Sequence, residues 1–282
     1  MRRSPPVERP PAAPLVTLST DIGWEYAAQV KAVLYARLPA GSVVDLTHEI
    51  RPHAVREAAF LVRHMANGYP PGSVHLAIVD PGVGGSRAPL AIQCRDGSFL
   101  VGPDNGVLMP LARELGLQRA VRLEPKRVVG GRSPSATFEG RDLFAPAAAL
   151  LATGSPLEAL GPKIRPLELR LPSARRRGNR AVGELVHIDR FGNLISNVPT
   201  AWIPPRTRTA QLTLSRRAPR TLPLVRTYSE LPFEELGVLG SSFGLVEVAQ
   251  REGSAADRIG AAVGERLELR WSSEAAARTG SA

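Results

Sequence analysis

The chain has 282 residues, of which 43% are hydrophobic and 22% are charged, and its formal net charge is +10. These proportions are typical of a globular protein with one large or two smaller domains, and they exclude wholesale disorder. No apolar stretch approaches the roughly 20 residues that span a bilayer, so we expect no membrane partner. The single cysteine, Cys94, excludes an intramolecular disulfide and a cysteine-rich metal site.

The positive charge comes almost entirely from arginine, because Lys31, Lys126 and Lys163 are the only lysines. A surface that binds nucleic acid gathers basic residues on one face, with aromatic residues between them where single strands are bound. Here the arginines are spread along the chain and aromatic residues make up only 5%. We therefore expect a solvated basic surface and no nucleic-acid partner.

The first segment, residues 1–13, is charged and proline-rich and has no apolar core of the kind found in secretory signals. It is predicted to be a disordered arm, and the protein is expected to be cytoplasmic.

From residue 14 onward, short apolar runs alternate with segments of helical periodicity. Apolar runs predict strands over 15–18, 43–46, 74–79, 90–94 and 99–101, the last two joined by an Asp-Gly hairpin turn. Apolar residues at helical spacing predict helices over 27–38, 54–66, 107–115 and 143–152. Strands alternating with helices predict an α/β domain over 14–162, built on a mostly parallel sheet flanked by helices.

The second half of the chain has the pattern of a smaller β domain. Residues 163–180 are rich in proline and arginine, lack periodicity and are predicted to be a linker. Strand patterns then dominate residues 181–272, and a polar tail covers 273–282. The predicted strands lie at 182–188, 194–198, 210–214, 246–249 and 267–271.

Three carboxylates follow predicted strands and are each next to or near a glycine: Asp21, Asp80 and Asp104, the last followed by Asn105. Ligands bind at the carboxyl ends of strands in open α/β sheets. A single pair of this kind is typical of an ordinary turn. Three at the ends of strands in one domain favour a substrate site.

Two further polar clusters allow both a structural and a functional interpretation. Glu139 and Arg141 precede a predicted helix and are consistent with an exposed ion pair, while Asp142 is typical of a helix cap. In the second domain, Asp189 and Asn193 fit a hairpin turn, or they face a polar ligand beside the ring of Phe191.

Several motifs with known chemistry are missing. The sequence has no phosphate-binding GxxxxGK[ST] loop, no G-x-S-x-G elbow and no HExxH, and its five histidines show no metal-ligand spacing. We expect no metal and no cofactor.

Seven segments, in order, make the sequence recognisable. They are STDIG, VVDLTHEI, PGSVHLAIVDPGVGGSR, VGPDNGVL, TFEGRDLFAPAAALLATG, HIDRFGNLISN and GSSFGLVEVA. Together they resemble the S-adenosylmethionine hydroxide adenosyltransferase family, whose halogenating relatives are the fluorinase and chlorinase, over about residues 15–270. The resemblance implies an N-terminal α/β domain and a C-terminal β-barrel-like domain. It also implies a homotrimer whose sites lie between the first domain of one subunit and the second domain of its neighbour.

The resemblance also implies a reaction. Water or hydroxide displaces methionine from C5′ of S-adenosylmethionine, giving adenosine and L-methionine without a metal. Family members use an Asp-Arg-His trio; Asp80 and Arg87 match its first two members, but the third position is Glu139. We weigh three hypotheses: a hydrolase in which glutamate replaces histidine as proton acceptor, an adenosyl-binding protein with slow or lost turnover, and a halide-using enzyme. The last is disfavoured because the serine of the halogenases is Gly140 here.

The resemblance assigns the substrate contacts as follows. Asp21 holds the ribose hydroxyls and Asp189 the methionine ammonium. Asn193 and Phe191 meet the adenine. The remaining positions are Ser242 at the methionine carboxylate, Phe243 where halogenases have an arginine, and the backbone near Arg251 and Glu252 at the adenine edge.

Overall fold

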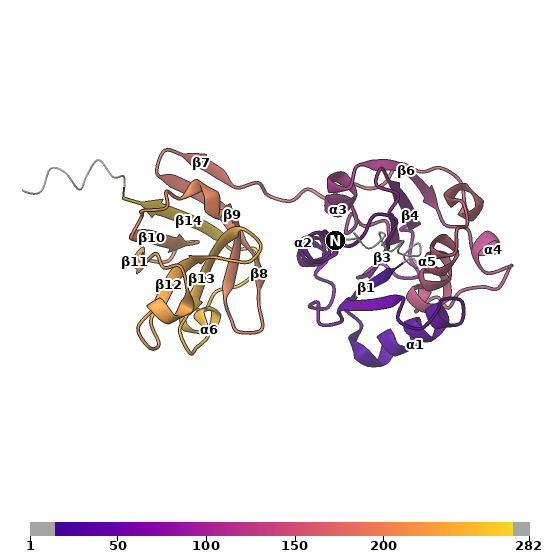
Figure 1. The fold of residues 1–282 in the computed structure, drawn as a ribbon, viewed down its shortest axis with the longest axis horizontal. Helices are drawn as coiled ribbons and strands as arrows, with labels where there is room; N and C mark the ends of the chain where they lie inside the picture. Colours follow the sequence, from indigo (N-terminus) through magenta and orange to yellow (C-terminus); the bar gives the residue numbers. More distant parts are fainter. Residues whose placement is uncertain (1–14, 273–282) are drawn as a thin grey trace, which may run out of the picture. The chain divides into compact units, whose positions relative to one another are not determined.

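The computed structural model describes residues 15–272, so the predicted arm at 1–13 and tail at 273–282 lie outside the described residues. The chain forms two compact units; the first ends at Leu169 and the second begins at Arg170 (Figure 1). We call them unit 1 and unit 2.

Unit 1 is built on a six-stranded sheet in the order β2-β1-β3-β5-β4-β6. Its strands are β1 (Val16–Thr20), β2 (Val43–Thr47), β3 (Val74–Ile78), β4 (Pro89–Cys94), β5 (Phe99–Pro103) and β6 (Leu117–Arg122). Neighbouring strands from β2 to β5 are parallel, and β4 runs antiparallel to both β5 and β6. The predicted α/β class with a mostly parallel sheet is confirmed.

Helices cover both faces of this sheet. They are α1 (Gly23–Tyr35), α2 (Val55–Ala66), α3 (Met109–Glu114), α4 (Pro125–Val128) and α5 (Ala145–Ala152), with a π-helical turn η1 (Gly140–Phe144) and a 3₁₀ turn η2 (Leu157–Leu160). Helices α1 and α5 pack together on one face, and α2 and α3 on the other (Figure 1). Every residue of β1 and β3 is buried, including the polar side chains of Thr17 and His75, which are hydrogen-bonded to each other at 2.9 Å. No helix within residues 15–272 is long and apolar enough to cross a membrane.

Unit 2 is an antiparallel sheet in the order β11-β10-β14-β8-β9-β13-β12, with β7 paired to β8. Its strands are β7 (Arg175–Arg177), β8 (Arg180–Ile188), β9 (Leu194–Pro199), β10 (Thr209–Leu214), β11 (Arg220–Pro223), β12 (Leu236–Gly240), β13 (Leu245–Gln250) and β14 (Arg266–Trp271). Short turns η3 (Thr200–Trp202) and η4 (Tyr228–Glu230) and the helix α6 (Ala255–Ile259) connect them. A bridge between Leu224 and Val238 brings the chain after β11 to β12 and nearly closes the barrel-like sheet that the resemblance implies.

The segment 163–180 is more ordered than its composition suggests. Lys163 forms a bridge with Val121 of β6, and the backbone N–H of Leu167 donates to Asp104. Farther along, β7 pairs with β8. Its first part therefore belongs to unit 1 and its last part to unit 2.

Glu268 of β14 gives unit 2 a stability that depends on pH. Hydrogen bonds from Arg180, at 2.7 Å for Nε, and from Arg270 lower the pKa of Glu268 from its ordinary 4.5 to about 2. The lowered pKa means that the stabilisation is complete above pH 4.5 and is lost as the pH falls toward 2. We expect Glu268→Gln to destabilise unit 2 by about 1 kcal/mol at pH 7. Urea unfolding from pH 7 to pH 2 tests this; a difference from wild type that stays constant over that range would contradict it.

Candidate active site

The three predicted strand-end carboxylates belong to adjacent strands of unit 1. Asp21 directly follows β1, Asp80 comes two residues after the end of β3, and Asp104 directly follows β5. Because β1, β3 and β5 are neighbours and run parallel, their carboxyl ends meet at one edge of the sheet. The register pairs Thr20 with Ile78, and the backbone N–H of Asp21 donates to the carbonyl of Ile78 at 3.3 Å.

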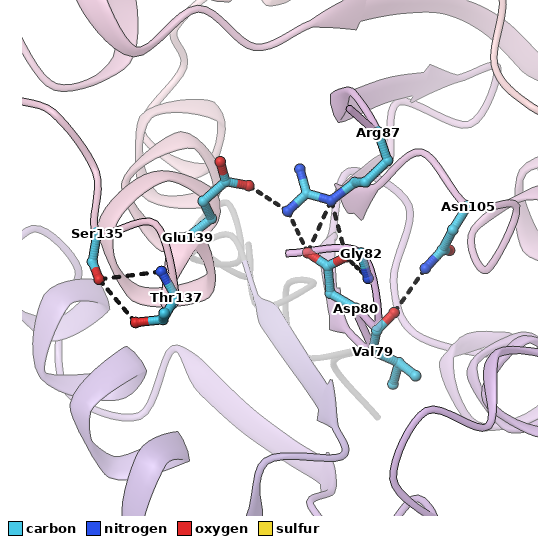
Figure 2. Close-up of polar contacts among 8 residues, drawn as sticks. All are labelled: Val79, Asp80, Gly82, Arg87, Asn105, Ser135, Thr137 and Glu139. Atoms are coloured by element: carbon cyan, nitrogen blue, oxygen red, sulfur yellow. Dashed lines mark hydrogen bonds and ion pairs between the residues drawn. The ribbon is translucent and has the colours of Figure 1, made fainter. Parts of the chain in front are cut away.

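At this edge, the guanidinium of Arg87 bridges two carboxylates (Figure 2). Its Nε lies 2.9 Å from each carboxylate oxygen of Asp80, and its Nη2 donates to Oδ2 of Asp80 and to Oε2 of Glu139. The side chains of Arg87, Asp80 and Glu139 are 11%, 7% and 20% exposed. The structure thus brings together the three residues that the sequence analysis assigns to catalysis, and we call them the Asp80–Arg87–Glu139 trio.

Local packing fixes the trio. The backbone N–H of Gly82 donates to Oδ1 of Asp80 at 3.2 Å (Figure 2). The ring of Phe144 lies 5.3 Å from the Arg87 guanidinium. Gly84 has φ +73°, and a Cβ there would lie only 2.4 Å from the carbonyl oxygen of Ala136. The glycine-rich loop after Asp80 therefore packs closely against the segment that leads to Glu139.

The electrostatics of the trio keep Arg87 charged. Burial lowers the pKa of Arg87, but its hydrogen bonds to Asp80 and Glu139 and the charges of both carboxylates raise it by more. Two carboxyl side chains and one guanidinium give the trio a formal net charge of −1. Such a site favours a cationic substrate and repels a halide ion from solution, whereas a neutral water molecule enters without that repulsion.

Asp21 is held in place by its own contacts. Its Oδ2 accepts the backbone N–H of His53 at 2.8 Å, and His53 has an unusual φ of +65°. Burial raises the pKa of Asp21, although the hydrogen bond from His53 opposes the increase. The result is a half-buried carboxylate, positioned at the same edge as the trio, with the two acceptor oxygens that a ribose diol requires.

Asp104 and Asn105 make contacts within the protein instead of facing outward. Asp104 is 4% exposed, accepts the backbone N–H of Leu167 at 2.7 Å and has its pKa raised by burial. Asn105 donates to the carbonyl of Val79 at 2.8 Å (Figure 2). It also accepts from the backbone N–H of Val107 at 3.1 Å. Asn105 therefore holds the chain directly before Asp80, and Asp104 holds the segment at Leu167 against the end of β5.

Unit 2 contains a cavity of about 720 Å³. Five residues singled out from the sequence line it, together with four that the sequence analysis missed: Asp189, Phe191, Asn193, Arg251 and Glu252, then Tyr228, Ser229, Gln250 and Gly253. The lining, drawn from the described part of unit 2, does not include Ser242 or Phe243, which lie in the turn between β12 and β13. Tyr228 could have been singled out from the sequence because it is an isolated tyrosine in a polar loop, in a chain that is poor in aromatic residues.

The turn of Asp189 to Asn193 forms one wall of this cavity. Oδ1 of Asp189 accepts the backbone N–H groups of Phe191 and Asn193, both at 2.9 Å, and its Oδ2 accepts the side-chain amide of Asn193 at 2.9 Å. The Phe191 ring is 70% exposed. This is the hairpin turn that the sequence allows as a structural interpretation, and Phe191 also lines the cavity, where contact with a ligand stays a prediction.

The chain is similar to known proteins over nearly its whole length. Residues 16–161 match the SAM hydroxide adenosyltransferase N-terminal domain and residues 183–268 the C-terminal domain of that family. Two proteins named (R)-S-adenosyl-L-methionine hydrolase are similar: one from Salinispora tropica at 38% identity, covering 91% of this chain and 97% of the relative, and one from Thermus thermophilus at 40%, covering 89% and 97%.

A more distant relative and a solved structure are also similar to this chain. A protein named fluorinase from Nocardia brasiliensis is 27% identical, covering 66% of this chain and 71% of the relative. A crystal structure of an uncharacterized conserved protein from Thermotoga maritima superposes with a TM-score of 0.82 at 30% identity, covering 91% of this chain and 100% of that chain. The two matched domains and these relatives place the chain in the SAM hydroxide adenosyltransferase family.

Proposed function

We propose that the protein hydrolyses S-adenosylmethionine to adenosine and L-methionine by attack of water or hydroxide at C5′. The observation that carries the proposal is the Asp80–Arg87–Glu139 trio at the carboxyl edge of the unit 1 sheet. Relatives named (R)-S-adenosyl-L-methionine hydrolase, at 38% and 40% identity, support it.

The chemistry requires little beyond placing and deprotonating water. The sulfonium is already a good leaving group, so the electron pair of the C5′–S bond goes to the methionine sulfur and no proton has to be donated to it. A C5′–O bond forms as the water oxygen attacks from the opposite side, and the water proton must be accepted. Bulk water, with a pKa of about 15.7, is a poor nucleophile at neutral pH, so positioning and a nearby base supply the rate.

The trio divides this work among its members. Asp80, held at both oxygens by Arg87, accepts a hydrogen bond from the water and fixes its direction of attack. Glu139 meets Arg87 through Oε2, so we assign its Oε1 to the water proton. Arg87 balances the charge of the two carboxylates, and Asp21 holds the ribose hydroxyls. Asp104 and Asn105 support the edge from within.

The two ends of the substrate, its methionine and its adenine, are assigned to unit 2. We propose that its Asp189 meets the methionine ammonium and that Phe191 and Asn193 meet the adenine. Phe191, exposed on the cavity wall, supports this. The remaining assignments are Ser242 and Phe243 near the methionine carboxylate and the backbone at Arg251 and Glu252 at the adenine edge.

The proposal includes an assembly and a location. We infer a homotrimer with active sites shared between subunits, as the resemblance implies, and a cytoplasmic protein that needs no cofactor or metal. The single cysteine, which can form no intramolecular disulfide, supports the location. Light scattering of the purified protein tests the assembly: a mass of three chains is expected, and one of a single chain would contradict it.

Product analysis tests the activity. The purified protein is incubated with S-adenosylmethionine, with and without chloride, and the products are separated by chromatography. Adenosine and methionine should form in equal amounts and in proportion to the protein, and Glu158→Ala, which removes an exposed carboxylate of unit 1, should not change the rate. Thermal stabilisation by the substrate without adenosine would indicate a binding protein, and chloride-dependent 5′-chloro-5′-deoxyadenosine would indicate a halide-using enzyme.

The proposed role of Glu139 as proton acceptor can be tested through the pH dependence of kcat. A histidine accepts a proton only when neutral, and the reference pKa of its imidazole is near 6.5. We therefore expect the kcat of Glu139→His, divided by that of wild type, to fall about tenfold between pH 7.5 and pH 5.5. A ratio that does not change with pH would show that this position does not take the proton.

A further inference from the structure

A buried acid lies beneath the cavity of unit 2 and has no part in the proposed mechanism. Glu247 of β13 is 3% exposed, and its Oε1 accepts the hydroxyl of Tyr228 at 2.7 Å. The register places Glu247 opposite Leu239 of β12 and Ile195 of β9, so both flanking strands offer apolar neighbours. A carboxylate among apolar neighbours is costly without a hydrogen-bond partner, and Tyr228 provides one.

Tyr228 links this acid to the cavity. It lines the cavity and is 48% exposed. Its carbonyl accepts the backbone N–H of Leu231 at 3.1 Å. Nη1 of Arg251 anchors the same turn η4 by donating to the carbonyls of Leu231 at 2.8 Å and Ser229 at 3.3 Å. The tyrosine is thus fixed through its backbone at one end and its hydroxyl at the other.

The hydrogen bond also sets what the tyrosine can offer a ligand. A phenol has one proton, and Tyr228 donates it to Glu247. Burial, the hydrogen bond and the negative charges of Glu247 and Asp189 all raise the pKa of Tyr228, so the proton stays in place at neutral pH. The remaining lone pairs of the oxygen can only accept a hydrogen bond.

We propose that Glu247 is a positioning residue that fixes the Tyr228 hydroxyl as a hydrogen-bond acceptor, so that the cavity selects substrates presenting an N–H donor there. The inference rests on the proposed function. Asp189, whose charge acts on both residues, adds to the preference for a donor or a cation. S-adenosylmethionine has two such groups, the 6-amino group of adenine and the α-ammonium of methionine, and the experiment distinguishes them.

The test compares three substrates across four proteins. The substrates are S-adenosylmethionine, its 6-oxo (inosyl) analogue and its analogue without the α-amino group. The proteins are wild type, Tyr228→Phe, Glu247→Gln and the control Tyr35→Phe, which removes an exposed hydroxyl in unit 1. We expect wild type to prefer S-adenosylmethionine over one analogue, and both cavity variants to reduce that preference in kcat/KM about tenfold. The amide introduced by Glu247→Gln can donate to the Tyr228 oxygen and so occupy the acceptor. Tyr35→Phe should retain the wild-type preference.

In the two cavity variants, the kcat/KM of one analogue should move closer to that of S-adenosylmethionine. The group that this analogue lacks is the donor that Tyr228 meets. Variants that lower kcat/KM equally for all three substrates, or leave every ratio unchanged, would overturn the inference and would reduce the pair to a structural contact. Calorimetric binding of adenosine and inosine, which needs no turnover, separates this result from the proposed function. If the protein hydrolyses S-adenosylmethionine but the substrate preferences are the same in wild type and variants, the proposed function holds and the inference is rejected. If the protein binds adenosine better than inosine only when Tyr228 is present, but hydrolyses nothing, the inference holds and the proposed function is rejected.

Discussion

Asp80→Ala is expected to lower kcat about 10³-fold while changing the dissociation constant of S-adenosylmethionine by less than about threefold. Asp80 is 7% exposed and is held at both oxygens by Arg87, so its carboxylate is positioned for the attacking water. Its removal takes away an interaction that matters most in the transition state, when the water oxygen approaches C5′ and its proton becomes acidic. Single-turnover rates and substrate titration by calorimetry measure the two quantities separately.

Asp21→Ala provides the matched comparison. It removes a carboxylate from the adjacent strand end, but one that we assign to the ribose in both ground and transition states. Its main effect should be on the dissociation constant. If Asp80→Ala turned over at the wild-type rate, or if the two variants lost binding and turnover in the same proportion, the assignment of the water to Asp80 would be wrong.

Arg87→Leu is expected to lower both activity and stability. It leaves the carboxylates of Asp80 and Glu139 largely buried without their shared cation. Breaking a buried ion pair on one side costs about 3–5 kcal/mol, which for a domain of this size corresponds to a melting temperature lower by about 10 °C. Differential scanning calorimetry measures this change. In contrast, Arg113→Leu removes the exposed partner of Glu168 and should change the melting temperature by less than about 3 °C.

A rescue experiment separates the charge of Arg87 from its role in catalysis. The triple variant Arg87→Leu, Asp80→Asn, Glu139→Gln removes both unpaired negative charges. It should recover most of the lost melting temperature but none of the activity, because the acceptors for the water are also removed. A triple variant as unstable as Arg87→Leu would show that the loss comes from packing against Phe144 and not from unpaired charge.

The sequence predicts those parts of the fold and site that depend on local patterns. The buried strands β1 and β3 stand out because both of their faces are covered, and the carboxylates after them follow from the parallel topology. The contact between Arg87 and Glu139 joins residues 52 positions apart. Periodicity carries no information about such a pairing, which came instead from the family resemblance.

The sequence does not predict strands β6 and β12, because their local sequences are not typical of strands. β6 (Leu117–Arg122) has exposed residues through its first half and is a strand because it pairs with β4. β12 (Leu236–Gly240) contains two glycines, which disfavour strands in isolation. At Gly237 a Cβ would lie 2.4 Å from the side chain of Leu231, so a larger residue there would require Leu231 to move. Asp104 and Asn105 share the strand-end pattern of Asp21 and Asp80, and only the three-dimensional contacts show that they bond inward.

The register of β1 and β3 has a consequence for how this architecture diversifies. Asp21 and Asp80 leave strands that are separated by one sheet spacing, about 4.8 Å, and their offset is set by the pairing of Thr20 with Ile78. In the proposed mechanism, the positions of the ribose and of the attacking water are therefore set by the pairing of β1 with β3, whereas the residue at position 139 lies on a separate segment. Evolution can exchange the attacking group by altering that segment while the geometry of displacement is inherited unchanged. An ancestral protein with this fold would acquire a new nucleophile without a change in the residues that bind the nucleoside.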